Sequence, residues 1–292
     1  MTRIALAVMW LLHWLPLPTL AALGRGLGRL LHRFGHERRN IALVNLRLCF
    51  PTMSEAERAD LVKRHFEAFG RSFLERGLLW WASEARIRRL VRVTGAEHLD
   101  AIKGKQPVIL LVPHFVGLDM AWTRMSMDYD MSGIYANQKN LLFNAALYKG
   151  RARFGKSLML SRQESTRKGL KAMKAGMPFF YLPDMDFGQR DTIFVPFFGF
   201  PAATITGLSR LARLAGAVVL PVIAHVEAEG YLIEIGAPWT DFPSQNTDGI
   251  EADTRRMNAF IESQVLTMPE QYFWLHKRFK TRPSGEKSVY RP

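Results

Sequence analysis

The sequence predicts an α/β protein with a mixed central sheet flanked by helices, preceded by an N-terminal hydrophobic helix. From residue 91 onward, short apolar segments alternate with segments of helical periodicity, as in folds that cover a sheet with helices. The chain has 292 residues and is 48% hydrophobic, which is enough for a large core. It contains no internal repeat, so we expect residues 26–292 to form one structural unit.

The first 25 residues are expected to form a membrane anchor. Ile4–Leu23 contains no formal charge and is about as long as a bilayer-spanning helix. The small residues near Leu20 also fit a cleaved signal peptide. Basic residues just past an apolar span tend to stay in the cytoplasm, and five arginines lie just past this one. We therefore prefer an uncleaved membrane anchor with the rest of the chain facing the cytoplasm. His13, Pro16 and Pro18 leave a kinked span or an interfacial helix open, and a buried helix of a soluble protein is the remaining alternative.

Residues 26–90 read as a basic and amphipathic helical region. Ser54 and Glu57 form a capping box, which predicts that a helix begins there. Apolar residues then follow at spacings of three and four, ending near Trp80 and Trp81. We interpret this stripe as core packing, with some of its aromatic rings available to line an apolar groove. Its members are Leu61, Val62, Phe66, Phe69, Phe73 and Leu78.

Residues 91–292 alternate between predicted strands and helices. Glycines at 176 and 216 follow two of the helices as C-terminal caps. The tail from Lys277 is polar and basic, and we expect it to be partly irregular. The predicted strands are 91–95, 108–112, 132–135, 179–182, 218–226 and 231–235, and the predicted helices are 117–127, 141–154, 166–175, 206–215 and 251–266.

The charge balance predicts an acidic partner. Lysine and arginine exceed aspartate and glutamate by 40 to 26, which gives a net charge of +14. Beside an apolar anchor, anionic membrane lipid is the first choice of partner. No zinc-finger spacing, aromatic RNA-binding strand motif or clear helix-turn-helix pattern is present, so we expect no nucleic acid. The single cysteine, Cys49, excludes an internal disulfide.

The segment Pro107–Asp119 carries the strongest sign of chemistry. A run of apolar residues delivers His114 to the carboxyl end of a predicted strand, where open α/β sheets place their ligands. Asp119 follows five residues later. A histidine held by a carboxylate is a suitable general base for a hydroxyl group. A structural histidine satisfied by hydrogen bonds is the alternative.

Three further segments contain candidate binding residues. Arg151 and Arg153 lie near the end of a predicted helix, and Asp184 and Asp186 follow a predicted buried strand. An apolar loop, Phe194–Gly207, precedes the next helix. Charged residues beside an aromatic loop suggest a substrate with polar and apolar parts. The two aspartates could equally shape a turn, and without a histidine at ligand spacing we expect no metal site.

These segments resemble the late acyltransferases of lipid A biosynthesis, within the lysophospholipid acyltransferase superfamily. The pattern His114-x-x-x-x-Asp119 is similar to the superfamily signature. The Glu-Gly-Thr-type loop of the glycerol-phosphate enzymes is missing from this sequence, which favours the lipid A branch. Together with the N-terminal segment, the resemblance covers almost the whole chain. Its other parts are Arg39–Pro51, Pro183–Gly188, Val195–Gly199, Ala202–Gly207 and Trp274–Glu286.

The resemblance implies a glycerolipid-acyltransferase-like domain over residues 91–292 and a reaction without a cofactor. It also implies that the anchor lies in the inner membrane, with anionic inner-membrane lipid as a partner. An acyl-acyl carrier protein would donate a fatty acyl chain to a hydroxyl of a 3-hydroxyacyl chain on a Kdo-bearing lipid A precursor. His114 would be the general base, oriented by Asp119. Arg151 and Asp184 match further family motifs, and Arg153 and Asp186 beside them complete the predicted substrate-binding set.

Two other functions stay open at this stage. One is acyl transfer to a different glycolipid, such as a phosphatidylinositol mannoside or an ornithine-type lipid. The other is a non-catalytic protein that binds a membrane surface. Acyl length is undetermined, although Phe197, Phe198 and Met120 are candidates for the floor of an acyl groove.

Overall fold

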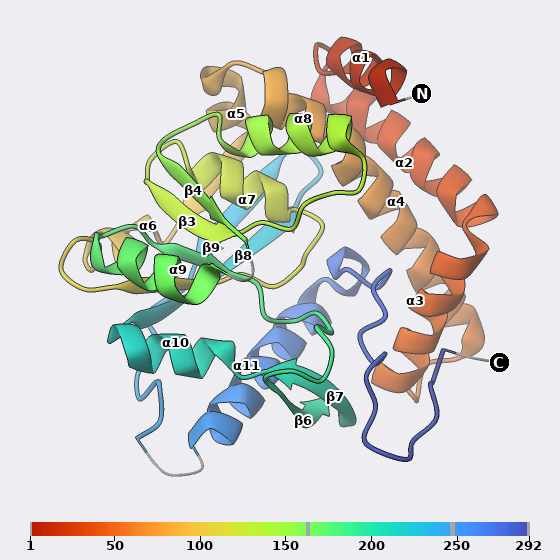
Figure 1. Cartoon of the computed structure of the whole chain (residues 1–292). Helices are drawn as coiled ribbons and strands as arrows, with labels where there is room; N and C mark the ends of the chain where they lie inside the picture. Colours follow the sequence, from red (N-terminus) through yellow and green to blue (C-terminus); the bar gives the residue numbers. More distant parts are fainter. Residues whose placement is uncertain (1, 162–163, 246–248, 291–292) are drawn as a thin grey trace.

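A mostly parallel sheet forms the centre of the molecule (Figure 1). The computed structural model describes residues 2–161, 164–245 and 249–290. In these ranges the strands of the large sheet are ordered β1-β9-β8-β2-β5-β3-β4, with β8 and β9 antiparallel to each other and the other neighbours parallel. The mixed sheet predicted from the sequence is therefore confirmed. Its strands are Val91–Thr94 (β1), Val108–Leu111 (β2), Met131–Ile134 (β3), Ser157–Leu160 (β4), Phe179–Tyr181 (β5), Val218–Val226 (β8) and Tyr231–Ile235 (β9).

Helices cover both faces of this sheet, so its central strands are buried on both sides. Ile109 and Phe179 belong to one hydrophobic core, and Leu110 and Phe180 to another on the opposite face. This explains why the sequence of these strands is continuously apolar rather than alternating. The first core includes residues of α3 (His36–Cys49), α9 (Ser165–Lys174), α10 (Gly207–Ala215) and α11 (Gly249–Thr267). The second includes residues of α5 (Glu84–Leu90), α6 (Ala96–Asp100), α7 (Leu118–Met125) and α8 (Leu141–Arg151).

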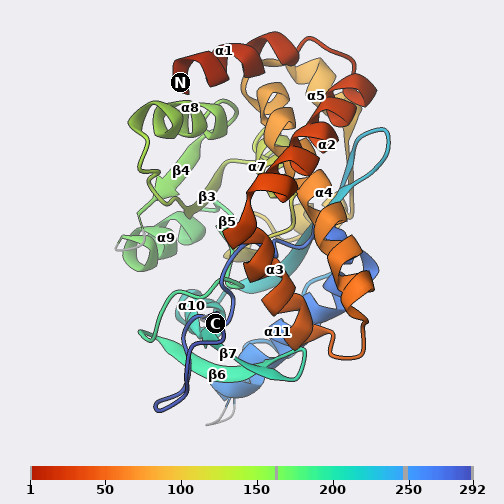
Figure 2. The ribbon, with the colours of Figure 1, turned by 90° about the vertical axis from the view of Figure 1, so that its right-hand side faces the viewer.

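The long helix α4 (Glu55–Trp81) crosses the ends of both cores. It begins at the predicted capping box, where the Ser54 hydroxyl accepts the Glu57 N–H and the Glu57 carboxylate accepts the Ser54 N–H. Helix α2 (Leu17–Phe34) lies along α4 (Figure 2). Their contact is close because glycines face each other there. A Cβ atom built on Gly28 would lie 2.1 Å from the Phe66 carbonyl oxygen, and one on Gly70 would lie 2.5 Å from the Gly28 nitrogen. Larger residues would force the two helices apart.

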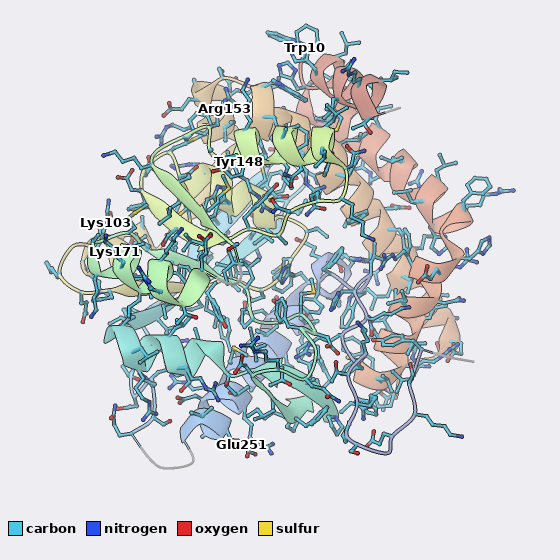
Figure 3. All side chains as sticks on the ribbon, in the orientation of Figure 1. Trp10, Lys103, Tyr148, Arg153, Lys171 and Glu251 are labelled. Carbon is cyan, nitrogen blue, oxygen red and sulfur yellow. The ribbon has the colours of Figure 1, made fainter. Side chains whose placement is uncertain are left out.

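The expected N-terminal anchor is divided into two helices. α1 (Thr2–Leu12) ends before a turn, and α2 starts after Pro16, so Ile4–Leu23 does not form one continuous helix. Among the described residues, none of the helices combines the length and the apolar character needed to cross a membrane. α1 nonetheless exposes several large apolar side chains, and Trp10 extends away from the body of the molecule (Figure 3).

The predicted apolar loop at Phe194–Gly207 is instead mostly a hairpin. Strands β6 (Thr192–Phe197) and β7 (Phe200–Ile205) pair antiparallel around a turn in which Phe198 and Gly199 both have positive φ. Two such residues suit the tight turns that join twisted strands. The prediction failed because Pro196 and Pro201 argue against strands in a sequence, whereas here they lie opposite each other near the turn.

Most other predicted elements are present within a few residues of their expected ends. After the 3-10 helix η1 (Pro269–Gln271), the described part of the chain contains neither helix nor strand. This includes the tail from Lys277, which was predicted to be partly irregular. The strand β4 and the helices α3, α5 and α6 were not predicted individually. Each of α5, α6 and β4 has seven residues or fewer, too few to establish a periodicity.

Candidate active site

The candidate site begins where two neighbouring parallel strands end. After β2 the chain continues through Pro113 to His114, and after β5 it continues through Pro183 to Asp184. Leu111 of β2 lies opposite Tyr181 of β5. Each polar residue comes three positions after these partners, so the same register brings His114 opposite Asp184.

His114 and Asp184 are joined by two hydrogen bonds. The His114 backbone N–H donates to Asp184 Oδ2 at 2.8 Å, and His114 Nδ1 lies 2.6 Å from Asp184 Oδ1. Asp184 is fully buried, and burial alone would raise the pKa of its carboxyl group. The charge and hydrogen bonds of His114 outweigh burial and hold the pKa of Asp184 below its usual range. An ionised carboxylate can only accept, so Nδ1 carries a proton, and when the ring is neutral its lone pair is on Nε2.

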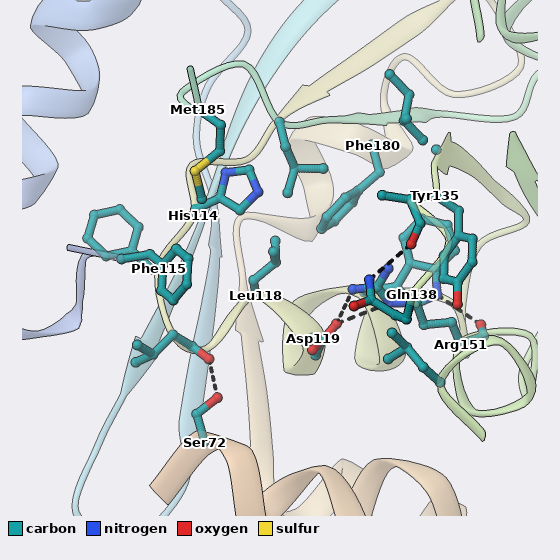
Figure 4. Close-up of a pocket in the computed structure, with 18 of the residues that line it drawn as sticks. Ser72, His114, Phe115, Leu118, Asp119, Tyr135, Gln138, Arg151, Phe180 and Met185 are labelled. Carbon is teal, nitrogen blue, oxygen red and sulfur yellow. Dashed lines mark hydrogen bonds and ion pairs between the residues drawn. The ribbon is translucent and has the colours of Figure 1, made fainter. Parts of the chain in front are cut away.

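The backbone around His114 is fixed from the C-terminal part of the chain. The Phe273 N–H donates to the His114 carbonyl oxygen at 2.9 Å, and the Val116 N–H donates to the Gln271 carbonyl oxygen at 2.9 Å. The Ser72 hydroxyl of α4 donates to the Val116 carbonyl oxygen (Figure 4). Because both sides of the loop are held, the imidazole has a defined position before any substrate binds.

Asp119 contacts two arginines instead of His114. Its Oδ2 accepts a hydrogen bond from Arg76 Nε at 2.8 Å, and its Oδ1 accepts two from Arg151, from Nε at 3.1 Å and from Nη2 at 2.6 Å. Burial would raise the pKa of Asp119, but the two guanidinium groups outweigh it and lower the pKa well below its usual range. The predicted orientation of His114 by Asp119 is thus corrected: Asp184 makes that contact, because sheet register rather than chain spacing decides which carboxylate reaches the ring.

Arg76 was missed by the sequence analysis. It lies on α4 and stacks on Phe73, with its guanidinium carbon 5.4 Å from the ring centroid. Phe69, Phe73 and Arg76 follow one another at spacings of four and three, so they share a face of the helix. A single arginine on an otherwise aromatic face was the signal available in the sequence.

His114 and the Asp119 cluster line one pocket, shown in Figure 4. Its volume is about 560 Å³, and aromatic and aliphatic side chains form most of its walls. In the close-up, Leu118 and Phe180 lie between His114 and the Asp119–Arg151 pair. The pocket therefore offers a basic nitrogen and a cationic group at separate places along an apolar cavity. Its walls include Phe69 and Phe73 of α4, Phe143 and Leu147 of α8, Trp122, and Tyr135.

Comparison with known proteins shows the family of the chain. The bacterial lipid A biosynthesis acyltransferase family matches residues 1–281. The chain belongs to this family. It is 39% identical to the lipid A biosynthesis lauroyltransferase of Escherichia coli K12, over 99% of this chain and 94% of that protein. It is 33% identical to the palmitoleoyltransferase of the same strain over the same shares, and 33% identical to its myristoyltransferase over 94% and 84%.

The chain is therefore an acyltransferase of lipid A biosynthesis. Among solved structures, it is similar to the 1-acyl-sn-glycerophosphate acyltransferase of Thermotoga maritima. The TM-score is 0.41 and the identity is 15%, over 92% of this chain and 99% of the other.

Two predicted binding residues of the acyltransferase are used in other contacts. Arg153 donates to the carbonyl oxygens of Leu79 and Ala82 at the end of α4. Asp186 accepts hydrogen bonds from the backbone N–H and the hydroxyl of Thr281, at 2.6 and 2.7 Å. Neither residue lines the pocket that contains His114. In this structure Arg153 caps a helix and Asp186 fastens the C-terminal tail.

His276 extends the strand-end part of the acyltransferase site. Its Nε2 accepts the backbone N–H of Asp186 at 3.0 Å, which requires that nitrogen to be unprotonated. Burial, together with the nearby charges of His114 and Arg278, lowers the pKa of His276 to about 4. The neutral imidazole therefore helps to hold the loop that carries Asp184.

The remaining predicted residues are in the cores. Cys49 is buried and unpaired, and burial raises the pKa of its thiol well above the usual value, so it is a poor nucleophile for the acyltransferase. Met120 and Phe197 are buried in the two cores. Neither they nor Phe198 line the pocket, so the structure does not support them as the floor of a groove there. The apolar wall of the pocket instead includes Phe143, whose ring stacks with that of Phe73.

Proposed function

We propose that this acyltransferase moves a fatty acyl chain from acyl-acyl carrier protein to a hydroxyl of a 3-hydroxyacyl chain on a Kdo-bearing lipid A precursor. The observation that carries the proposal is a buried Asp184 holding Nδ1 of a histidine that lines an apolar pocket. The pocket suits a fatty chain, and the histidine suits a hydroxyl acceptor. The relatives named lauroyl-, palmitoleoyl- and myristoyltransferase support a fatty acyl substrate.

His114 acts as general base in the proposed reaction. Its Nε2 accepts the hydroxyl proton while the acceptor oxygen forms a bond to the thioester carbonyl carbon. The carbon–sulfur bond then breaks, and the imidazolium returns the proton to the departing thiolate. Asp184 keeps the ring in the required tautomer and stabilises its positive charge, so it is a positioning residue. No acyl-enzyme is needed, which agrees with the buried state of Cys49.

Arg76, Asp119 and Arg151 form the anion-binding part of the site. The two guanidinium groups face one carboxylate, which leaves an excess of one positive charge inside an apolar pocket. The Nη atoms of Arg76 make no hydrogen bond to the described residues and can donate to an anion. Phosphate is well matched to such donors, and both the acyl donor and the lipid A precursor carry it. Asp119 preorganises the two arginines.

The N-terminal helices provide the proposed attachment to the inner membrane. α1 exposes Ile4, Trp10 and Leu11 at 69%, 46% and 61%, and α2 exposes Phe34 at 67%. Arginines of α2 accompany these apolar residues, a combination typical of helices that lie in the bilayer interface. The proposed site then faces the cytoplasm, where acyl carrier protein is found. The acidic surface of acyl carrier protein suits the positive net charge of this chain.

Acyl transfer by the purified protein tests this proposal. Kdo-bearing tetra-acylated lipid A precursor is offered with acyl carrier protein charged with acyl chains of graded length, and the products are read by mass spectrometry. We expect a new acyl ester with the wild type and a loss of at least about 10³-fold in rate with His114→Ala. If His114→Ala formed the product at the same rate as the wild type, the proposed role of His114 as the base would be contradicted. Folded wild type without product from any donor would contradict the proposed substrates.

A further inference from the structure

The outer face of α8 carries an unusual set of exposed apolar side chains. Leu141 is 80% exposed, the highest value among the exposed large hydrophobic residues of the described chain, and Leu142 and Tyr148 are each 46% exposed. Leu141, Ala145 and Tyr148 follow one another at spacings of four and three, so they form one stripe along the helix. Single exposed leucines are common, but a stripe on one helix indicates a contact surface.

This stripe continues the exposed surface of α1. The two helices are in contact, and α1 lies beside α8 at one end of the molecule in Figure 2. The Asn140 side-chain amide, just before α8, donates to the Thr2 hydroxyl of α1 at 2.7 Å. Figure 3 shows Trp10 of α1 and Tyr148 of α8 at this same end. One surface therefore combines residues that are more than 130 positions apart in the chain.

The charges around this surface favour an anionic bilayer. α1 and α8 contain no acidic residue. Arg3 of α1 is exposed, Lys139 lies just before α8, and Lys149 lies near its end. Basic residues bordering an apolar helix face match the arrangement of helices that insert among anionic headgroups.

The opposite side of α8 forms a wall of the active-site pocket. Phe143, Leu147 and Arg151 of this helix line the same cavity as His114. A single helix thus separates the apolar outer surface from the pocket. If the outer surface is in the bilayer, the pocket lies one helix diameter, about 10 Å, from the lipid phase.

We propose that the outer face of α8 is a second membrane contact, which acts together with α1 to place the active-site pocket beside an anionic bilayer. A lipid acceptor then reaches His114 without leaving the membrane for the water phase. The kinetic part of this inference rests on the proposed function, since it assumes a membrane-resident acceptor. The binding part concerns the surface alone.

The test uses the full-length protein with Leu141→Ser and Leu142→Ser combined. The matched control combines Leu214→Ser of α10 and Leu266→Ser of α11, which are 60% and 62% exposed and lie on helices in the lower half of Figure 1, away from α1 and α8. Binding to vesicles of equimolar phosphatidylethanolamine and phosphatidylglycerol is measured by flotation. We expect about tenfold weaker binding for the α8 variant and unchanged binding for the control. Each leucine replaced on α8 removes apolar surface that the bilayer would bury. Melting temperatures confirm that both variants are folded.

Three other results decide the matter. Equal vesicle binding by the wild type and the α8 variant would overturn the proposal. A change of oligomeric state in the α8 variant with unchanged vesicle binding would assign the surface to a second copy of the chain and would also overturn it. With vesicle-bound lipid A precursor, the acceptor KM should rise about tenfold in the α8 variant while the donor KM stays unchanged. Vesicle binding is read without turnover, so a failure of the proposed reaction leaves this result interpretable.

Discussion

Asp184 and Asp119 are buried carboxylates beside the same pocket, but the structure holds them in different ways. Asp184 binds His114 across two adjacent strands, and the sheet register fixes both backbones. Asp119 binds Arg76 and Arg151, and its position depends on side chains from three helices, α4, α7 and α8. Both pKa values are lowered, so both groups are ionised at neutral pH. The strand-end region therefore sets up proton transfer, whereas the helical region sets up a positive charge.

Asp184→Asn is expected to have the largest effect. The amide keeps the shape of the side chain but has no negative charge to hold the Nδ1–H group and stabilise the imidazolium. We therefore expect kcat to fall about 10³-fold. Steady-state acyl transfer with saturating substrates measures it. Asp186→Asn, two residues later on the same loop, is the control, because Asp186 binds Thr281 and not His114. Similar losses of kcat in the two variants would contradict the assigned roles.

Asp119→Asn should have an intermediate effect on rate and a clear effect on stability. It leaves two partly buried guanidinium groups without a counter-ion, which should lower the free energy of unfolding by about 2 kcal/mol. The misplacement of Arg151 should lower kcat/KM about 10- to 100-fold. Denaturant unfolding and initial rates measure the two effects.

The matched control for Asp119 is Asp128→Asn. Asp128 also accepts hydrogen bonds from two arginines, Arg88 and Arg124, but its side chain is 36% exposed. Its loss should change the free energy of unfolding by only about 0–1 kcal/mol. Equal effects of the two substitutions on the free energy of unfolding would contradict the claim that burial makes the ion pairs of Asp119 stronger than those of Asp128.

Arg76→Gln should alter substrate binding more than turnover. Arg76 binds Asp119 and lines the pocket but makes no hydrogen bond to His114. We therefore expect KM for the anionic substrate to rise about tenfold and kcat to stay within about threefold. Arg64→Gln on the same helix is the control, because Arg64 pairs with Asp60 and Glu270 at the surface. A fall in kcat with an unchanged KM would place Arg76 in the chemical step instead.

A smaller effect is expected from pH in the strand-end region. The pKa of His276 is about 4 in the folded chain, below its usual value of about 6.5, so between these values the unfolded state binds more protons. Stability should therefore fall as pH decreases through this window. His276→Gln should make the free energy of unfolding depend less steeply on pH across this window, as measured by denaturant unfolding. Part of the pH dependence should remain in this variant, because His65 is also buried and has a pKa of about 4. An unchanged slope in His276→Gln would contradict the neutral state assigned to His276.

The comparison of the two aspartates also shows what the sequence could predict. The strand before His114 was correctly located because its residues are apolar on both faces, and the start of α4 because Ser54 and Glu57 form a capping box. These features depend on neighbours in the chain. Of the candidate residues, the structure brings His114, Asp119, Arg151 and Asp184 together at one pocket, and their roles stay a prediction.

The pairing within the site depended on information that one sequence does not contain. Asp184 is 70 residues from His114, and only the adjacency and register of β2 and β5 place it against the imidazole. A hint was present, since each strand is followed by one residue, a proline and then the polar group. Arg76 was missed because a charged residue on an amphipathic helix usually faces solvent.

The proton on His114 Nδ1 gives the most direct test of the account. In protein labelled with ¹⁵N-histidine, this proton should give a strongly downfield NMR signal coupled to Nδ1, assigned by its absence in His114→Gln. We predict that the signal persists in Asp119→Asn and disappears in Asp184→Asn, because Asp184 accepts this hydrogen bond. Its loss in Asp119→Asn together with its persistence in Asp184→Asn would contradict the account.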